Sequence, residues 1–137
     1  MHLILIQVTK GEHIQYWIKT AKKDWKLVNK LFGSKDYVYA LFFAHLTLEK
    51  LCKAHWVKDN QSNYPPRIHN LIWIIKNTKL QFSEEQLAFL KKMNDFQIEG
   101  RYPDYMMKIY KICNFKYTKS TLQQVKSIKR CLQEKLP

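Results

Sequence analysis

The chain contains few residues that interrupt regular structure. Its 137 residues include only three glycines and four prolines. An all-β sandwich needs many tight turns, and glycine and proline supply most of the special backbone angles of such turns. The scarcity of both therefore favours long helices over a strand-rich fold. Aromatic residues make up 14% of the chain. Disordered chains contain few of them, so we expect a folded domain.

Two long helices are expected in the first half of the chain. Apolar residues recur at steps of three and four over residues 14–32, with lysines on the opposite side. This pattern predicts an amphipathic helix that a left-handed Gly33 ends. Ser34 is expected to cap the next helix, over about residues 35–57. Apolar residues cover more than one face of this second helix. A small bundle alone would leave some of them exposed, so we predict a homodimer that uses one of these two helices.

Shorter helices are expected in the middle of the chain. Residues 59–66 are polar and end in two prolines, which predicts a loop. A short helix should follow from residue 67 or 68 to residue 75. Ser83 and Gln86 have the spacing of a capping box, which predicts the start of a fourth helix that continues to about Ile98.

The last third of the chain predicts one clear helix. Residues 100–105 read as a break, and residues 106–116 are ambiguous between helix and loop. Ser120 and Gln123 form a second possible capping box. They predict a final helix that reaches the neighbourhood of Lys135.

Together these patterns predict an all-α fold, an up-and-down antiparallel helical bundle of about five helices. A single domain over residues 13–137 would follow an N-terminal extension of residues 1–12. Residues 1–8 are apolar and could form either a frayed extension or a short added strand. They lack the features of a signal peptide, and no apolar stretch is long enough to cross a bilayer. We therefore expect a soluble, cytoplasmic protein that does not enter a membrane.

The charge is strongly basic and unevenly distributed. The formal net charge is +13, with +5 on residues 10–35, +1 on residues 36–104 and +7 on residues 105–137. If the first and last helices are neighbours, they form a basic side that could hold polyanions. Lysine supplies almost all of the positive charge, and arginine, the usual bidentate reader of phosphates, is scarce. The alternative is therefore a lysine-coated solvent face that reflects an AT-rich genome and solubility.

The cysteines and histidines do not suggest a metal or a disulfide framework. Cys52, Cys113 and Cys131 are odd in number and contain no CxxC pair, so we interpret them as small apolar side chains in a reducing compartment. His45 and His55 lack a third ligand at a suitable spacing. We expect no metal and no cofactor.

Five motifs occur in an order that resembles a known family. They are Tyr16-Trp17 in the opening helix, Leu48-Glu49-Lys50 within residues 40–54, Pro66-Arg67-Ile68-His69, Arg101-Tyr102-Pro103, and the closing amphipathic helix. In this order they resemble the HEPN domain (higher eukaryotes and prokaryotes nucleotide-binding) over about residues 13–136. The resemblance implies an up-and-down helical bundle, commonly a homodimer. Many bacterial members are paired with a minimal nucleotidyltransferase as a toxin–antitoxin system.

The resemblance does not extend to the ribonuclease signature of the wider group. Nuclease members carry an Arg followed, after four to six residues, by a His, and they cleave RNA without a metal. Neither Arg67, Arg101 nor Arg130 is followed by a His at that spacing. Asn70 also stands where the family more often has Asp. The sequence therefore favours binding over catalysis, and whether the chain is an enzyme stays open.

The resemblance places the candidate ligand-binding site at Arg67, His69, Arg101, Tyr102, Glu49 and Lys50. The first hypothesis is a binding module for a nucleotidyltransferase partner, a nucleotide or RNA, of the toxin type. The second is a divergent metal-independent ribonuclease that uses His69 with Arg67 or Arg101. The third is a dimeric scaffold without a ligand.

Each candidate residue also has a purely structural interpretation. His69 could bond to backbone or pack under the turn at Tyr102. Arg101 could form a salt bridge with Glu49 or Glu99. Glu49 and Lys50 could form an ion pair that only stabilises the helix.

Overall fold

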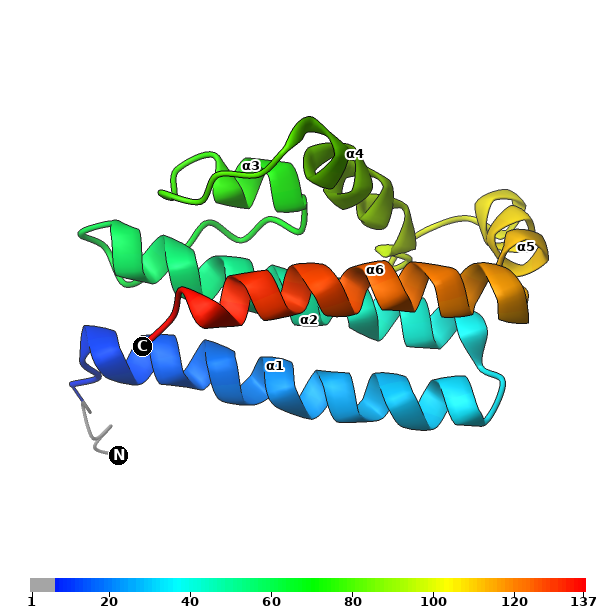
Figure 1. Ribbon diagram of the computed structural model, residues 1–137, viewed down its shortest axis with the longest axis horizontal. Helices are drawn as coiled ribbons and strands as arrows, with labels where there is room; N and C mark the ends of the chain where they lie inside the picture. Colours follow the sequence, from blue (N-terminus) through cyan, green and yellow to red (C-terminus); the bar gives the residue numbers. More distant parts are fainter. Residues whose placement is uncertain (1–6) are drawn as a thin grey trace, which may run out of the picture.

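The computed structural model describes residues 7–137, which fold into helices joined by short loops (Figure 1). The elements are α1 (Lys10–Gly33), α2 (Tyr37–Asp59), α3 (Leu71–Ile75), α4 (Glu84–Met93), the short 3-10 helix η1 (Asn94–Phe96), α5 (Pro103–Ile112) and α6 (Phe115–Glu134). No strand occurs in this range, which confirms the all-α bundle. The prediction of a frayed extension or a strand at the N-terminus concerns residues 1–8. Residues 1–6 lie outside the described residues, and Gln7 and Val8 belong to neither a helix nor a strand.

Helix α1 begins at a capping box that the sequence analysis missed. The Thr9 hydroxyl accepts from the backbone N–H of Glu12 at 3.1 Å, and Oε1 of Glu12 accepts from the backbone N–H of Thr9 at 3.2 Å. Both bonds satisfy donors that a helix start leaves free. The helix therefore begins at Lys10, inside the segment expected to be an extension. Its buried residues Ile14, Ala21 and Val28 lie against α2, which runs antiparallel to it (Figure 1).

The turn from α1 to α2 differs from the prediction by two residues. Gly33 is the last residue of α1, and the positive φ of 65° belongs to Lys35. The backbone N–H of Asp36 bonds to the carbonyl of Leu31, which is the long bond of a Schellman motif with Lys35 in the left-handed position. The expected caps are therefore wrong. The Ser34 hydroxyl donates to the carbonyl at the end of α1 instead of capping α2.

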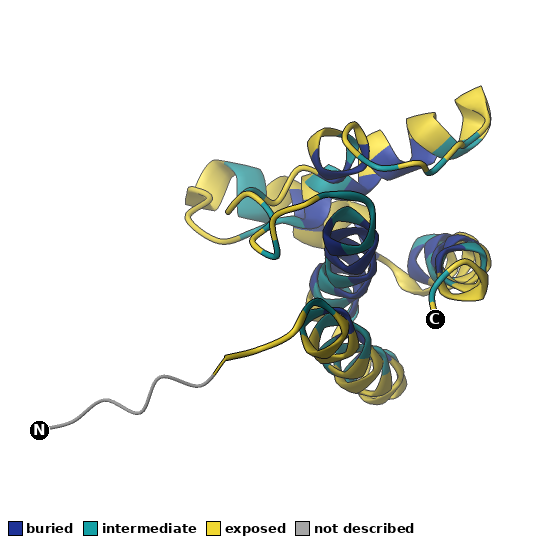
Figure 2. Ribbon diagram, turned by 90° about the vertical axis from the view of Figure 1, so that its left-hand side faces the viewer, coloured by how far each residue is buried: buried dark blue, intermediate teal, exposed yellow. Residues whose placement is uncertain are grey.

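Helix α2 is the centre of the molecule. Fifteen of its 23 residues are buried. Viewed end-on, it lies between α1, α6 and the layer made by α3 and α4 (Figure 2). This position explains why apolar residues cover more than one of its faces, because a helix enclosed on several sides is apolar around most of its surface. The chain buries these faces itself. The homodimer therefore stays a prediction, and the wide apolar surface of α2 no longer supports it.

The loop after α2 is longer than predicted. Residues 67–69 belong to it, and α3 begins at Leu71 because Asn70 caps it, accepting from the N–H groups of Ile72 and Trp73 at 3.0 and 3.3 Å. The predicted capping box at the start of α4 is confirmed. That helix ends at Met93 instead of Ile98, and the chain continues as the 3-10 helix η1.

The ambiguous segment 106–116 contains the end of one helix and the start of another. Helix α5 begins at Pro103, which suits the first helical position because proline lacks the N–H that would be free there. Asn114 then caps α6, accepting from the backbone N–H of Tyr117 at 2.8 Å. The second predicted capping box is wrong. Ser120 lies inside α6, because Asn114 already satisfies the helix start one and a half turns earlier.

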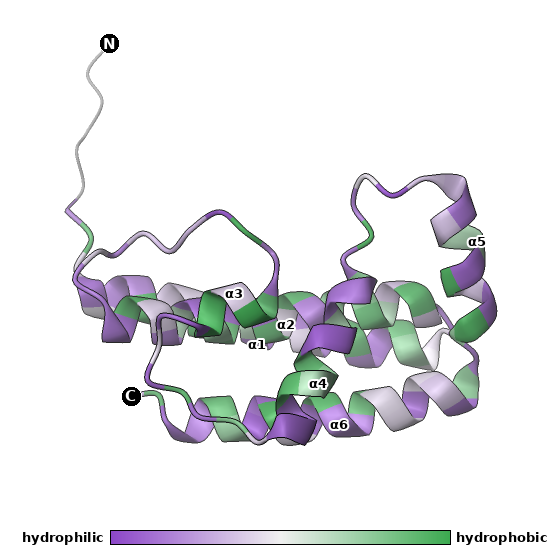
Figure 3. Ribbon diagram, turned by 90° about the horizontal axis from the view of Figure 1, so that it is seen from above, coloured by the Kyte–Doolittle hydropathy of each residue, from purple (hydrophilic) through white to green (hydrophobic). Residues whose placement is uncertain are grey.

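The apolar residues gather on the sides where α2, α4 and α6 meet (Figure 3). Cys52 and Cys113 are buried, Cys131 is half-buried, and none of the three forms a disulfide. Burial raises the pKa of the Cys52 thiol to about 12, so it behaves as an apolar side chain as predicted. No helix among residues 7–137 is long and apolar enough to cross a membrane.

Candidate functional site

A buried carboxylate organises the middle of α2. Glu49 is 4% exposed, and its two oxygens bind different partners. Oε2 accepts from Nζ of Lys53 at 3.1 Å, and Oε1 lies 2.9 Å from Nδ1 of His69. The expected Glu49–Lys50 pair is not formed, because consecutive helical residues face different directions. Lys50 instead pairs with Asp24 of α1 at 2.6 Å.

The local sequence explains how these side chains meet. Glu49 and Lys53 are four residues apart on α2, so they lie one above the other on one face. His69 comes from the loop before α3, and the two residues that follow it fix that loop. Asn94 donates to Oδ1 of Asn70 at 3.2 Å and accepts from the N–H of Leu71 at 2.9 Å. The loop is therefore tied to η1, and His69 faces Glu49.

A second histidine lies behind this cluster. His45 is fully buried, and its Nδ1 lies 3.9 Å from Oε1 of Glu49. Burial holds the pKa of His45 below its usual value of 6.5, and the nearby Glu49 opposes this shift only in part. His45 is therefore neutral at pH 7. His69 is the more exposed of the two histidines, with a side chain that is 50% exposed.

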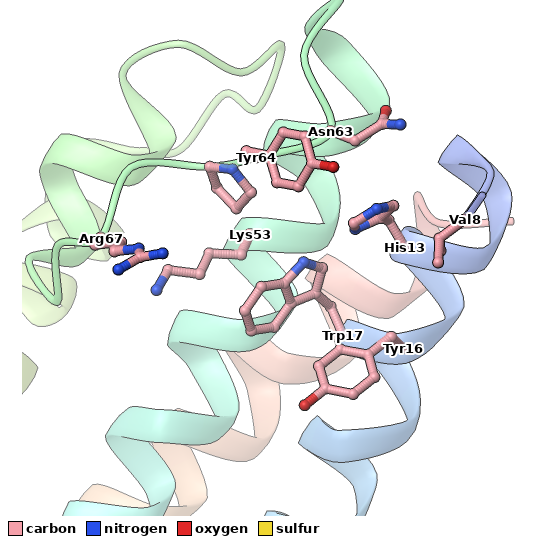
Figure 4. A pocket seen from close by; sticks show the side chains of 9 residues that line it. Val8, His13, Tyr16, Trp17, Lys53, Asn63, Tyr64 and Arg67 are labelled. Atoms are coloured by element: carbon pink, nitrogen blue, oxygen red, sulfur yellow. The ribbon is translucent and has the colours of Figure 1, made fainter. Parts of the chain in front are cut away.

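The outer end of the cluster opens into a cavity of about 570 Å³. It is lined by Val8, His13, Tyr16, Trp17, Lys53, Asn63, Tyr64, Pro65 and Arg67. These residues come from α1 with the segment before it, from α2 and from the loop after α2. Figure 4 shows the Lys53 and Arg67 side chains reaching toward one another on one side, with Trp17, Tyr64 and His13 around the rest. The volume lies within the ~300–1,000 Å³ typical of small-molecule sites.

Lys10 fixes the loop after α2 against the start of α1, beside this cavity. Nζ of Lys10 donates to the carbonyls of Val57 and Asn60, both at 2.7 Å, at the end of α2. A cation at a helix C-terminus is favoured by the helix dipole and satisfies free carbonyls. The loop is thereby fixed, and Tyr64 packs edge-to-face on His13 with ring centroids 5.4 Å apart.

The cavity combines positive charge with aromatic surface. Nζ of Lys53 lies 5.4 Å from the centroid of a Trp17 ring, and Arg67 forms no ion pair within residues 7–137. Nε1 of Trp17 and Oδ1 of Asn63 are buried and have no hydrogen-bond partner among the described residues. The walls therefore offer a cation for an anion and rings for stacking. These are the groups that a nucleotide requires.

The structure separates the sequence candidates into two groups. Glu49, Arg67 and His69 meet at the cluster and its cavity, whereas Arg101 and Tyr102 line neither. Nε of Arg101 donates to the carbonyl of Gln97 at 3.1 Å, and its guanidinium lies 4.3 Å from the Tyr105 ring centroid. The expected salt bridge from Arg101 to Glu49 or Glu99 is therefore not formed.

Tyr102 also makes no roof over His69. It is 81% exposed and stands immediately before α5. Glu49, rather than backbone or a turn, is the partner of His69.

Several residues of the cavity were not predicted from the sequence to be site residues. Trp17 was counted as part of an apolar stripe and of a family motif, and Tyr64 as part of a polar loop. Lys53 carried a usable signal, because it shares one helix face with an acidic residue four positions earlier, in a helix that is largely apolar. The approach of Tyr64 to His13 depends on the path of a loop, and no local pattern encodes that path.

No group of three or more His, Cys, Asp or Glu side chains is placed to hold a metal ion in the part of the chain that the structure describes. The arrangement is that of an all-helical domain with a basic, aromatic cavity beside a buried ion cluster. The family description "HEPN domain" matches residues 14–135, and the chain belongs to this family of nucleotide- and RNA-related modules. Neither the curated proteins nor the solved structures that were compared include a match to the chain.

Proposed function

We propose that the chain is a binding module that holds a nucleotide, free or at the end of an RNA, in the cavity between α1, α2 and the loop at residues 60–70. The observation that carries the proposal is the meeting of Lys53 and Arg67 with the rings of Trp17 and Tyr64 around one cavity. Family membership supports the same class of ligand.

The phosphate and the base of a nucleotide each have matching groups in the cavity. Arg67 binds the phosphate, because its planar guanidinium can donate two parallel hydrogen bonds to phosphate oxygens. Lys53 adds a second positive charge, and Glu49 keeps that charge at the cavity by pairing with its ammonium group. The base stacks on Trp17 and Tyr64, an interaction worth about 1–3 kcal/mol per base.

Isothermal titration calorimetry with AMP, ATP and a short single-stranded RNA tests this proposal. We expect Arg67→Ala to weaken nucleotide binding by about ten- to a hundredfold, since it removes charge-assisted hydrogen bonds. Arg67→Lys should recover only part of the loss, because lysine keeps the charge and lacks the fork. Arg130→Ala, on the exposed side of α6, is the matched control for AMP and ATP. No binding, or equal effects of both alanine variants, would contradict the proposal.

The finer part of the proposal concerns the biological setting. We propose that the module works beside a minimal nucleotidyltransferase as the toxin-type member of a pair. Family membership is the support for this part. Co-expression with the nucleotidyltransferase encoded beside the gene, followed by size-exclusion chromatography, tests it. Separate elution of the two proteins, or a neighbouring gene of another class, would reject it.

A second candidate function is metal-independent RNA cleavage. The bond between Glu49 and Nδ1 of His69 favours it, because it leaves Nε2 directed away from the carboxylate on a side chain that is 50% exposed. A histidine held in this way is suited to act as a general base. We expect little cleavage by the protein, because the Arg–His spacing of the nucleases is absent. The test is RNA cleavage in the presence of EDTA. If the protein cleaves RNA and His69→Ala abolishes the cleavage while circular dichroism shows an intact fold, the ribonuclease proposal would replace the binding proposal.

A further inference from the structure

Helix α5 stands apart from the rest of the bundle. It lies at one end of the molecule, beside the first turns of α2 and α6 (Figures 1 and 3). Of its ten residues only Ile109 is buried. An amphipathic helix of a globular domain normally buries its apolar face against its own chain. α5 buries little of it, so much of its apolar surface faces solvent.

The exposed apolar side chains gather at this end. Met107 and Tyr110, one turn apart on α5, are 60% and 53% exposed, and Phe115 and Tyr39 near them are 53% and 47% exposed. We call these four residues the α5 patch. Single exposed apolar residues are ordinary, whereas a cluster of them on one surface marks an interaction site.

The α5 patch is continuous. Tyr39 and Tyr110 line one hollow of about 250 Å³ together with Tyr37. Tyr37 in turn lies 6.3 Å from Phe115, ring centroid to ring centroid, and Phe115 stacks on Phe32 of α1 at 5.5 Å. The surface therefore runs from α5 over the start of α6 to the turn between α1 and α2.

The rim of the patch is positively charged. Five exposed lysines border it, at Lys35, Lys108, Lys111, Lys116 and Lys119. Asp36 and Asp104 are the acidic residues of the same region, and neither forms an ion pair with these lysines in the described part of the chain. Lys119 lies over the Phe115 ring at 5.7 Å, so positive charge reaches the apolar centre itself.

We propose that the α5 patch docks a partner protein through an acidic amphipathic helix, with apolar side chains along its centre and carboxylates on both flanks. Charge complementarity selects this occupant. A second copy of the chain in a two-fold dimer would place the same lysine rim against itself, which is unfavourable. RNA fits the lysines, but Met107, the most exposed residue of the patch, matches aliphatic side chains rather than bases. The proposal is independent of the nucleotide cavity.

Two synthetic helical peptides test the proposal against the full chain by fluorescence anisotropy. Both carry leucine along one face, and their flanks carry glutamate in one peptide and lysine in the other. The glutamate peptide should bind, and the lysine peptide should bind at least about tenfold more weakly. Met107→Glu and Tyr110→Glu should each weaken the glutamate peptide by about tenfold or more. Trp73→Glu, at an equally exposed aromatic residue on α3, should leave it unchanged.

Three results would overturn the proposal. The first is equal binding of the two peptides, or binding that Met107→Glu does not change. The second is a dimer of the chain alone in sedimentation equilibrium that Met107→Glu dissociates, which would assign the patch to a second copy. The third is binding of a single-stranded RNA that Met107→Glu abolishes and Arg67→Ala does not. Thermal melts of the variants confirm that each is folded, which is expected because the substituted side chains are exposed.

Discussion

Glu49 connects the two histidines and the lysine of the site. It is buried and negatively charged, and a buried carboxylate is tolerated only when partners satisfy it. Lys53 and His69 are those partners. Lys53 also lines the cavity, and His69 is half exposed to solvent. A change at Glu49 therefore affects both the stability of α2 and the position of the cavity cation.

Glu49→Leu should lower the free energy of unfolding by about 3–5 kcal/mol, because it leaves the nearly buried Lys53 ammonium without a counter-charge. Lys53→Met in the same chain should recover much of this loss. Urea unfolding of the two single variants and the double variant measures the coupling. Additive losses would show that the buried pair does not stabilise the fold.

The buried histidines predict a loss of stability in mild acid. Burial lowers the pKa of His45 and of His55 below 6.5 in the folded chain. Below about pH 6.5 the unfolded chain therefore binds more protons than the folded chain, and the free energy of unfolding falls as the pH falls. His45→Gln should reduce this slope. A free energy of unfolding that is constant from pH 7 to pH 5 would contradict the assignment of neutral histidines.

At the scale of the elements, the periodic patterns were reliable and the helix ends were less so. The stripes over α1 and α2 placed both long helices within a few residues, since their burial follows directly from spacing. Ser83 and Gln86 marked a true helix start, whereas Ser120 and Gln123 have the same spacing inside α6. The spacing of a capping box alone does not decide where a helix starts. At α6, Asn114 caps the helix six residues before Ser120.

Asn114→Ala should therefore destabilise the protein by about 1 kcal/mol, because the first N–H groups of α6 lose their acceptor. Ser120→Ala should change the stability little or raise it slightly, since alanine is the better helix former at an exposed interior position. Thermal or urea unfolding of the two variants compares them directly. A larger loss for Ser120→Ala would move the start of α6 back to the position expected from sequence.

The candidate site was only half predictable from the sequence. Glu49, Arg67 and His69 were named. Glu49 and His69 do bind one another, and Arg67 lines the neighbouring cavity. Arg101 and Tyr102 were grouped with them, yet they lie outside the site. They belong to the turn between η1 and α5, which runs away from Glu49. Loop paths of this kind depend on tertiary contacts such as the Asn70–Asn94 pair, which join residues distant in sequence.

At the scale of the whole molecule, the two basic helices are neighbours, as the polyanion hypothesis required. Both pack on α2, and Nζ of Lys129 in α6 lies 5.1 Å from the Trp25 ring centroid in α1. A shallow groove of about 180 Å³ between them includes Lys119 and Lys126. Burial, together with the neighbouring positive charges of Lys126 and Arg130, lowers the pKa of Lys129. The basic side therefore concentrates positive charge around aromatic surface.

If this side contacts RNA, the binding constant should fall steeply with salt, because each neutralised phosphate releases counterions. Lys126→Glu with Lys129→Glu should reduce both the affinity for RNA and the salt slope, with little effect on AMP. The cavity is lined by residues of the first half of α1 and this groove by residues of its second half. Filter binding at several salt concentrations measures the slope. An unchanged slope would leave the lysines as an ordinary solvent face.

The central claim is that the cavity beside Lys53 and Arg67 holds the nucleotide. A nuclear magnetic resonance titration of the ¹⁵N-labelled chain with AMP tests it most directly, because the Trp17 indole N–H lies in the cavity wall and has no partner there. We predict saturable shifts of this indole signal and of the backbone amides of Lys53, Tyr64 and Arg67. Shifts confined to α1 and α6 near Lys126, or no shifts as AMP reaches millimolar concentration, would contradict the claim.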